Sequence, residues 1–343
     1  MKKRDTGIDL IRVVSALGIV LHHYSRELAV QQVNTPHLFG GDYATGNFGW
    51  LFVTVFFMIS GMSLFANYSS IGIKEVLPFY KKRWLSIFPS FYFVWMYLYI
   101  GNVLTLGKFL YGGKIYCFIW TVLGVDGYVN RVYPTYYLIG EWFLGAIIIL
   151  YILYPLVLKL LTLKKLWIVF SLLFIALFEL ENRFAWGIQT GPFRGIFSCL
   201  LSFCIGMLLM KEKKVLKNKI LWGVSIVGSI LLLVFPITII DANITVHILG
   251  LFLTVALYNL GCCFENVKFV NEKMAFIAKL SYPIFLIHHV VIYKVGPNLK
   301  EKDLNEFQYF FFYVLIVALV FVLAWSLNKI VKFDRKKKEG VQK

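Results

Sequence analysis

The chain alternates long runs of apolar residues with short polar segments. Five of these runs contain no Asp, Glu, Lys or Arg: Asn47–Ile73, Trp84–Gly107, Ile220–Ile240, Ala242–Phe264 and Phe307–Asn328. A helix of about 20 apolar residues is long enough to cross the hydrocarbon core of a bilayer, which is about 30 Å thick. The pattern therefore predicts a membrane protein built from helices.

Five further segments are shorter or contain polar residues, but they complete a regular series. We expect an all-α, polytopic integral membrane protein of about ten transmembrane helices. The predicted spans cover about 7–27, 47–69, 84–106, 135–158, 165–181, 194–210, 220–240, 243–264, 276–296 and 307–329. The apolar segment Ile115–Val125 is too short to cross, so we interpret it as an interfacial or re-entrant piece.

Loop charge supports an even number of spans. With the N-terminus inside, the predicted cytoplasmic segments hold most of the Lys and Arg residues, including Lys81, Lys82 and Arg83 and the tail after Lys329. This asymmetry is the positive-inside pattern and places both termini in the cytoplasm. We expect one membrane-embedded domain over residues 1–343, in the plasma membrane, with no appended soluble domain.

The composition changes this picture little. Hydrophobic residues make up 59% of the 343 positions and charged residues 15%, while the formal net charge is +17. Because the basic residues lie in short loops between apolar runs, they indicate contact with anionic lipid headgroups rather than with nucleic acid. The five cysteines all lie in apolar segments without metal-binding spacing, so neither a disulfide framework nor a zinc site is expected.

The first predicted span carries charge where charge is expensive. Arg12 and His23 are eleven positions apart, which places them on one helix face about 16 Å from each other along the axis. Asp9 lies three residues before Arg12 on that face and can pair with it. His22 points about 100° away from His23. Ionisable groups inside a membrane span indicate function, although an Arg can also snorkel and a His can be a buried anchor.

Three other segments contain candidate residues. Glu141 falls in the outer half of its predicted span, near the expected depth of His23, where a carboxylate could orient an imidazole base. His288 and His289 fall near mid-span and suggest a polar cavity lining. Their side chains diverge by 100°, so they cannot both bind one metal as the paired histidines of zinc helices do, and no metal site is expected. Ser60, before Gly61, is a further candidate for the lining, although such pairs usually serve close packing.

These motifs together resemble the acyltransferase-3 family of membrane acyltransferases. Its first-span signature is Arg, ten residues, then His, which Arg12 and His23 match. The other similar segments follow in the family's order: FVTVFFMISGMSLF, FYKKRWLSIFPSFY, GEWFLGAIIILYILYP and LSYPIFLIHHVVI. The resemblance covers about residues 7 to 293. Family members often carry another Arg three residues after the basic pair, where this chain has Ser86.

The resemblance implies an O-acyltransferase. It would move an acyl group, expected to be acetyl, from cytoplasmic acyl-coenzyme A to a sugar hydroxyl of a cell-envelope, capsular or exopolysaccharide glycan. His23 would be catalytic, as base or transient acyl carrier. From its expected depth, Glu141 or another carboxylate would orient His23. Arg12, Lys82 and Arg83 would bind the donor. No permanently bound cofactor is implied; the partners are acyl-coenzyme A, a polysaccharide or lipid-linked sugar, and membrane lipid.

Two other classes of protein fit parts of the pattern. An exporter of a glycan or its precursor would also have many spans and a polar cavity, but a neutral sugar gives no reason for Arg12 and the basic segment. A non-catalytic component of a polysaccharide synthase would tolerate loss of His23. Acyl-coenzyme A binding separates the acyltransferase from the exporter.

Overall fold

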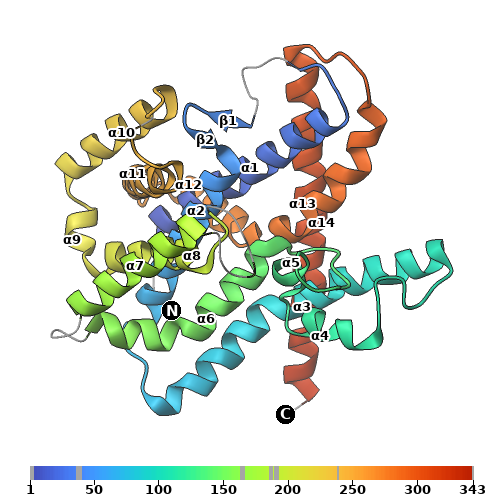
Figure 1. Ribbon diagram of the computed structural model, residues 1–343, viewed down its shortest axis with the longest axis horizontal. Helices are drawn as coiled ribbons and strands as arrows, with labels where there is room; N and C mark the ends of the chain where they lie inside the picture. The colour runs from blue at the N-terminus through green and yellow to red at the C-terminus, as the bar shows by residue number, and fades with distance from the viewer. Residues whose placement is uncertain are drawn as a thin grey trace. The chain divides into compact units, whose positions relative to one another are not determined.

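The computed structural model describes residues 4–35, 41–162, 167–184, 188, 193–237 and 239–341, and helices dominate them (Figure 1). The chain divides into two compact units. The first comprises Met1–Ile59 and Glu212–Lys343, and the second comprises Ser60–Lys211. The expectation of an all-α fold is confirmed: the described strands are two residues each, in one small hairpin.

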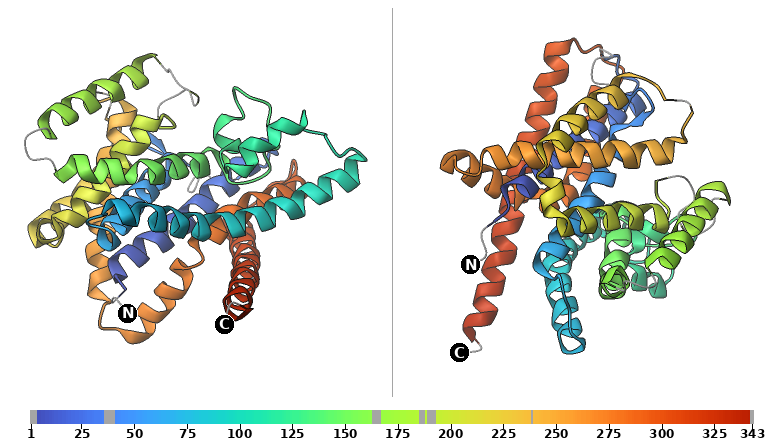
Figure 2. Two further views of the ribbon diagram at one scale, coloured as in Figure 1. Left: turned by 90° about the horizontal axis from the view of Figure 1, so that it is seen from below. Right: turned by 90° about the vertical axis from the view of Figure 1, so that its left-hand side faces the viewer.

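The first unit is formed by the N-terminal and C-terminal parts of the chain. Its elements are α1 (Thr6–Val30), β1 (Asp42–Tyr43), β2 (Gly46–Asn47), the beginning of α2 (Phe48–Asn67), α9 (Lys213–Leu216), α10 (Lys219–Val234), α11 (Ala242–Cys263), α12 (Lys268–Ala278), α13 (Ser281–Val295), the 3₁₀ helix η3 (Gly296–Leu299) and α14 (Glu306–Val341). The helix α1 packs on α11, α12 and α13, and α13 packs along α14 (Figures 1 and 2).

Glycines allow α1 and α11 to approach closely. A Cβ atom at Gly7 would lie 2.6 Å from the ring of Tyr258, and one at Gly261 would lie 2.7 Å from the Cα of Gly7. Small residues at such crossings are what permits close helix packing in membranes. Asp5 caps the start of α1 by accepting a hydrogen bond from the backbone N–H of Ile8. The sequence thus fixes both the start of α1 and its closest neighbour.

The segment predicted as one span over 276–296 is instead part of a bent pair of helices. The chain turns by 56° between α12 and α13. The first residues of the predicted span belong to α12, and the helix with both histidines starts at Ser281. The bounds of a span across this segment stay a prediction. Lys279 and Leu280 lie between the two helices, so the charge of Lys279 marks the break in the sequence.

The second unit consists of the end of α2 and the helices up to Lys211. These are α3 (Ile73–Leu106), the 3₁₀ helix η2 (Ile115–Cys117), α4 (Phe118–Val122), α5 (Asp126–Val129), α6 (Glu141–Thr162), α7 (Trp167–Phe184) and α8 (Ile196–Lys211). The helices α3 and α6 lie side by side (Figure 2). A Cβ atom at Gly61 would lie 2.0 Å from the carbonyl oxygen of Phe203, so this glycine is needed where α2 meets α8.

Two predicted boundaries in this unit differ from the structure. The helix α3 begins at Ile73, eleven residues before the predicted 84, so Lys82 and Arg83 lie within a continuous helix. The helix α6 begins at Glu141 rather than at 135. The intervening residues include Tyr136 and Ile139, which are apolar and buried but not helical. Residues buried in a folded connection can be as hydrophobic as residues of a membrane span, so hydropathy does not separate the two.

The apolar segment Ile115–Val125 forms η2 and α4 within that connection. The ring of Phe118 stacks on Tyr136 with centroids 4.0 Å apart, and the indole N–H of Trp95 donates to the carbonyl of Tyr136 at 2.9 Å. These contacts tie the connection to α3. Ile115 and Tyr116 are exposed, as an interfacial segment would require, although the interfacial position stays a prediction.

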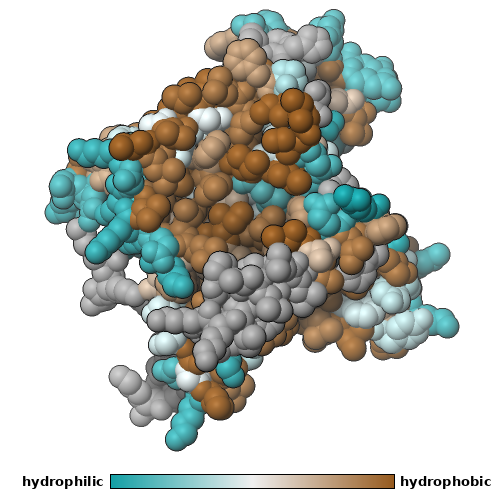
Figure 3. Space-filling model, turned by 60° about the vertical axis from the view of Figure 1, so that its left-hand side comes forward, coloured by the Kyte–Doolittle hydropathy of each residue, from teal (hydrophilic) through white to brown (hydrophobic). Residues whose placement is uncertain are grey.

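Among the described residues, six helices are long and apolar enough to cross a membrane, or seven if α12 and α13 form one bent span. Helices overlap all ten predicted segments, but α8 and α10 have only 16 residues each, and the count of ten stays a prediction. Large apolar side chains are exposed along α14, and hydrophobic residues cover much of the face in Figure 3. Such surfaces suit contact with lipid, so the chain is a multi-pass membrane protein.

Candidate functional site

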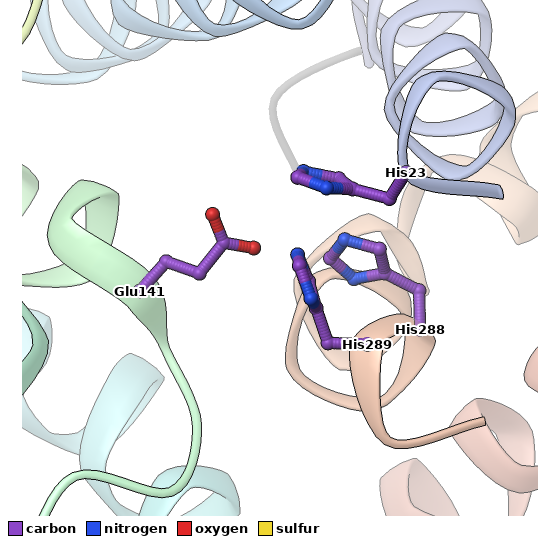
Figure 4. A group of neighbouring side chains, drawn as sticks. All are labelled: His23, Glu141, His288 and His289. Carbon is purple, nitrogen blue, oxygen red and sulfur yellow. The ribbon is translucent and has the colours of Figure 1, made fainter. Parts of the chain in front are cut away.

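Three histidines of the first unit come together where α1 meets α13 (Figure 4). The ring centroid of His23 is 5.1 Å from that of His288 and 4.0 Å from that of His289, while the latter two are 4.5 Å apart. One ring nitrogen of each residue lies within 4.8 Å of the others. We call His23, His288 and His289 the histidine cluster. It joins residues more than 260 positions apart in the sequence.

The tautomer of His288 follows from its contacts. Its side chain is buried, and its Nδ1 lies 2.7 Å from the carbonyl oxygen of Phe285 and 3.2 Å from that of Ile284. A carbonyl oxygen can only accept, so Nδ1 carries the hydrogen and the neutral ring keeps a lone pair on Nε2. The Nε2 atoms of His288 and His289 are both buried. The histidine cluster therefore holds the Nε2 lone pair of His288 in a buried position.

His22 points away from the histidine cluster, as its 100° offset predicts. Its Nδ1 lies 3.3 Å from the carbonyl oxygen of Gly41, and a Cβ atom at Gly49 would lie 2.4 Å from its Nε2. Its ring meets that of His23 edge-on at 5.1 Å. His22 thus packs against the beginning of α2, and it offers a matched control for substitutions at His23.

At the N-terminal end of α1, an ion-pair network surrounds Asp9, which is 1% exposed. Nη2 of Arg4 donates to Asp9 at 2.8 Å, and Nε of Arg4 donates to its other carboxylate oxygen. Nη1 of Arg12 lies 3.9 Å from Asp9. The predicted pairing of Asp9 with Arg12 is present, but Arg4 takes the shorter contacts. The side chain of Arg12 is 31% exposed.

In the second unit, Lys82 and Arg83 lie beside aromatic rings. Nζ of Lys82 and the guanidinium carbon of Arg83 are each 5.6 Å from the ring centroid of Tyr68. The guanidinium of Arg83 also approaches Phe79 and Tyr151, each at 5.9 Å. Nε of Arg83 is buried and finds no hydrogen-bond acceptor within the part of the chain that the structure describes. A buried cationic donor of this kind is suited to an anionic ligand.

Ser86 does not extend this basic group. Its hydroxyl donates to the carbonyl oxygen of Arg83 at 2.7 Å, one turn earlier in α3. The Arg that the resemblance leads us to expect at this position is therefore replaced by a side chain that bonds its own helix. Lys82 and Arg83 are left as the cations of this segment that contact Tyr68.

Glu141 begins α6 with a strained backbone. Its φ is 42°, in the left-handed region that non-glycine residues rarely adopt, and it follows Gly140 with φ 90°. Such conformations cluster at functional sites because the surrounding structure must enforce them. Arg194 interacts electrostatically with Glu141 and with Arg131, and its guanidinium lies 5.7 Å from the ring centroid of Trp142. The carboxylate is therefore held in a cationic environment within its own unit.

A comparison with protein families identifies the family of this chain. The family model described as an acyltransferase domain matches residues 5–329, which is nearly the whole chain. The chain belongs to the acyltransferase-3 family. No curated protein and no solved structure matches it. The resemblance read from the five sequence motifs is confirmed, and the protein is a membrane acyltransferase.

The predicted site residues of this acyltransferase fall in different places. His23 and His288 meet in the first unit, where Asp9 and Arg12 also pair with each other. Lys82, Arg83, Ser60 and Glu141 belong to the second unit. The predicted pairing of Glu141 with His23 joins the two units and stays a prediction. The assignment of Ser60 to a cavity lining also stays one; its neighbour Gly61 serves the contact of α2 with α8.

Sequence reasoning missed several members of these groups. His288 and His289 were both expected in a cavity lining, but their 100° offset argued against a shared ligand, and their rings nevertheless meet. Arg194 and Arg131 were not among the candidate residues that the sequence suggested. Nothing in the sequence around Tyr68 indicates that its ring contacts Lys82 and Arg83. A search for cations near the start of α6 could have found Arg131, whereas the others depend on tertiary packing.

Proposed function

We propose that this acyltransferase moves an acetyl group from acyl-coenzyme A to a hydroxyl of a cell-envelope polysaccharide sugar, in the plasma membrane. The observation that carries the proposal is the position of His23 in the histidine cluster of a chain that belongs to this family. An imidazole is the side chain best matched to proton transfer near neutral pH.

The basic and aromatic group at Lys82 and Arg83 supports a coenzyme A donor. Two cations close to the ring of Tyr68 provide charge for phosphates and a face for a base to stack on. Arg12 supplies a further, partly exposed cation in the other unit. Coenzyme A is too large and too charged to cross a bilayer, whereas an acetyl group is small. A donor held at its phosphates could deliver only the acetyl group inward.

The transfer step needs a base. A sugar hydroxyl has a pKa far above 7, so it attacks a thioester only when its proton is removed as the new bond forms. His23 would take that proton. The hydroxyl oxygen forms an ester bond with the acetyl carbonyl carbon, the carbon–sulfur bond breaks, and the coenzyme A thiolate leaves and accepts the proton from the imidazolium. Glu141 would orient the imidazole and stabilise its charged form.

The test separates chemistry from donor binding. In cells expressing the chain, radiolabelled acetyl groups incorporated into the envelope polysaccharide are counted for wild type, His23→Ala and the control His22→Ala. A positioned base contributes about 10²–10⁴-fold, so we expect label to fall at least 100-fold in His23→Ala and little in His22→Ala. Wild-type incorporation by His23→Ala would show that the catalytic assignment is wrong.

Donor binding is measured on the detergent-purified protein by calorimetry with acetyl-coenzyme A. His23→Ala should bind as the wild type does, whereas Arg83→Ala should bind more weakly. Lys74→Ala, an exposed cation in the first turn of α3, is the matched control and should behave as the wild type. A folded wild type that binds no acetyl-coenzyme A would contradict the proposal and favour an exporter.

A further inference from the structure

The histidine cluster has the composition of a metal site. Three imidazoles are the protein ligands of many catalytic zinc centres, which keep a fourth position for water or a substrate. In the first unit, ring nitrogens of His23, His288 and His289 all lie within 4.8 Å of one another. Nitrogens around a tetrahedral zinc with bonds of 2.0–2.1 Å are about 3.3 Å apart. Modest rotations of the rings would therefore bring the three nitrogens to ligand distance.

The surroundings of His288 match those of a ligand. A metal-binding histidine usually donates the N–H of its other ring nitrogen to a carbonyl or carboxylate, which fixes the tautomer and orients the lone pair. His288 donates from Nδ1 to the carbonyl oxygen of Phe285 at 2.7 Å, so Nε2 keeps its lone pair. This nitrogen is buried, as is Nε2 of His289. One ligand of the set is thus already fixed in the form that binds a metal.

The helices that carry the cluster are tied to a common neighbour. The Tyr24 hydroxyl, next to His23, donates to the carbonyl oxygen of Tyr309 in α14 at 3.1 Å, and the Ser25 hydroxyl lies 2.6 Å from that of Tyr309. The helix α13 packs along the same α14. The ring of Tyr293 meets His289 at 4.9 Å. Because α1 and α13 both contact α14, the backbone positions that carry the three imidazoles are held close together.

We propose that His23, His288 and His289 form a binding site for a divalent transition metal of the zinc class. The sequence argued against a metal because adjacent histidines on a helix diverge by 100°. Their rings nevertheless lie 4.5 Å apart, since imidazole side chains reach far enough to converge on a third group from α1. Bound metal occupies the lone pair that the proposed function gives to His23, so, resting on that function, occupancy inhibits acyl transfer.

The site is tested by metal content, which does not depend on activity. The full chain, purified in detergent with a tag that lacks histidine, is stripped with chelator, incubated with zinc chloride and desalted. Elemental analysis should find about one zinc per chain in wild type and in the control His22→Gln. Loss of an outer-shell partner alone weakens metal binding about 10–100-fold, so His289→Gln, which removes a ligand, should weaken it by about 100-fold or more.

Two further measurements keep the test decisive if His289→Gln folds poorly. Zinc should raise the melting temperature of wild type, because a ligand that binds only the folded state stabilises it. Cobalt(II) bound to wild type should give the visible absorption of a tetrahedral nitrogen site, without the near-ultraviolet band of a thiolate. A wild type that retains no zinc, equal zinc in a folded His289→Gln variant, or a thiolate band from Cys262 or Cys263 would each overturn the proposal.

An acyl-transfer assay tests the inhibitory role separately from metal binding. Zinc added to wild type should suppress acetyl incorporation, and chelator should restore it. Zinc binding without any acyl transfer in untreated wild type would refute the proposed function and leave the metal site standing. Acyl transfer with no zinc binding would do the reverse. Zinc binding that leaves transfer unchanged or accelerates it would refute the inhibitory role.

Discussion

A buried carboxyl group beside α6 makes a sharp prediction about stability and pH. Asp126 begins α5 and is 1% exposed. Burial raises its pKa to about 7, although hydrogen bonds from the backbone N–H of Gly127 at 2.9 Å and the Thr121 hydroxyl at 3.3 Å favour the charged form. A Cβ atom at Gly127 would lie 2.5 Å from the carbonyl oxygen of Glu141, so α5 supports the strained start of α6.

The perturbation is Asp126→Asn, which is neutral at every pH. Its amide oxygen can accept from Gly127, and its amide nitrogen can donate to Thr121. A pKa raised from 3.8 to about 7 is about three units, and each unit corresponds to 1.36 kcal/mol. Because the folded-state pKa is raised, the contribution of the neutral carboxyl is fully present below about pH 4 and is lost as pH rises to about 7. Wild type should therefore be less stable than Asp126→Asn by about 4 kcal/mol above pH 7.

The assay is thermal unfolding of the detergent-purified proteins, followed by tryptophan fluorescence between pH 4.5 and 8. The difference in melting temperature between Asp126→Asn and wild type should grow with pH and then level off above pH 7. Asp42→Asn is the control. Asp42 is 60% exposed and its carboxylate lies 3.6 Å from Arg26, so this surface pair should contribute little at any pH. A variant that melts at or below the wild-type temperature at pH 8 would refute the reasoning about burial.

Two further substitutions test the start of α6 and the start of α8. Glu141→Gly should melt at the wild-type temperature or above it, because glycine removes a left-handed strain of about 1–2 kcal/mol, while acetyl incorporation should be lost; a clear fall in melting temperature would contradict the strain. Glu181→Ala should lower the free energy of unfolding by about 1–3 kcal/mol, because the Glu181 carboxylate accepts from the backbone N–H groups of Phe197 at 2.9 Å and Ser198 at 3.1 Å. Glu181→Gln keeps one acceptor and should lose less; equal losses in both variants would show that these bonds are not the cause.

The sequence predicted which segments are helical better than it predicted where the helices end. Runs without charge reveal a helix because only apolar side chains can face lipid. The same apolar character continues into residues 135–140, which form a largely buried connection before α6. At the 56° bend between α12 and α13, the predicted span ran through the charged Lys279. Hydropathy does not distinguish residues that face lipid from residues buried inside the protein, so the start of α6 needed the structure.

The candidate site was predictable where its members share one helix. Arg12, Asp9 and His23 follow from helical spacing, and the pair of Asp9 with Arg12 is present. The contact of His23 with His289 depends on α1 packing against α13, more than 260 residues later, and helical spacing carries no information about that. The left-handed backbone of Glu141 could not be predicted either, because the identity of one Glu residue does not indicate its φ angle.

The surroundings of His23 come from more than one helix. An imidazole in a membrane span is costly unless polar neighbours accompany it. His288 and His289 meet this need from α13, and α13 reaches its place because α1 crosses α11 at Gly7 and Gly261 and is bonded to α14 through Tyr24. The residue that we propose as the base is near the N-terminus, whereas the α13 side chains that contact it come from the last third of the chain. A change anywhere in that packing acts on His23 without touching it.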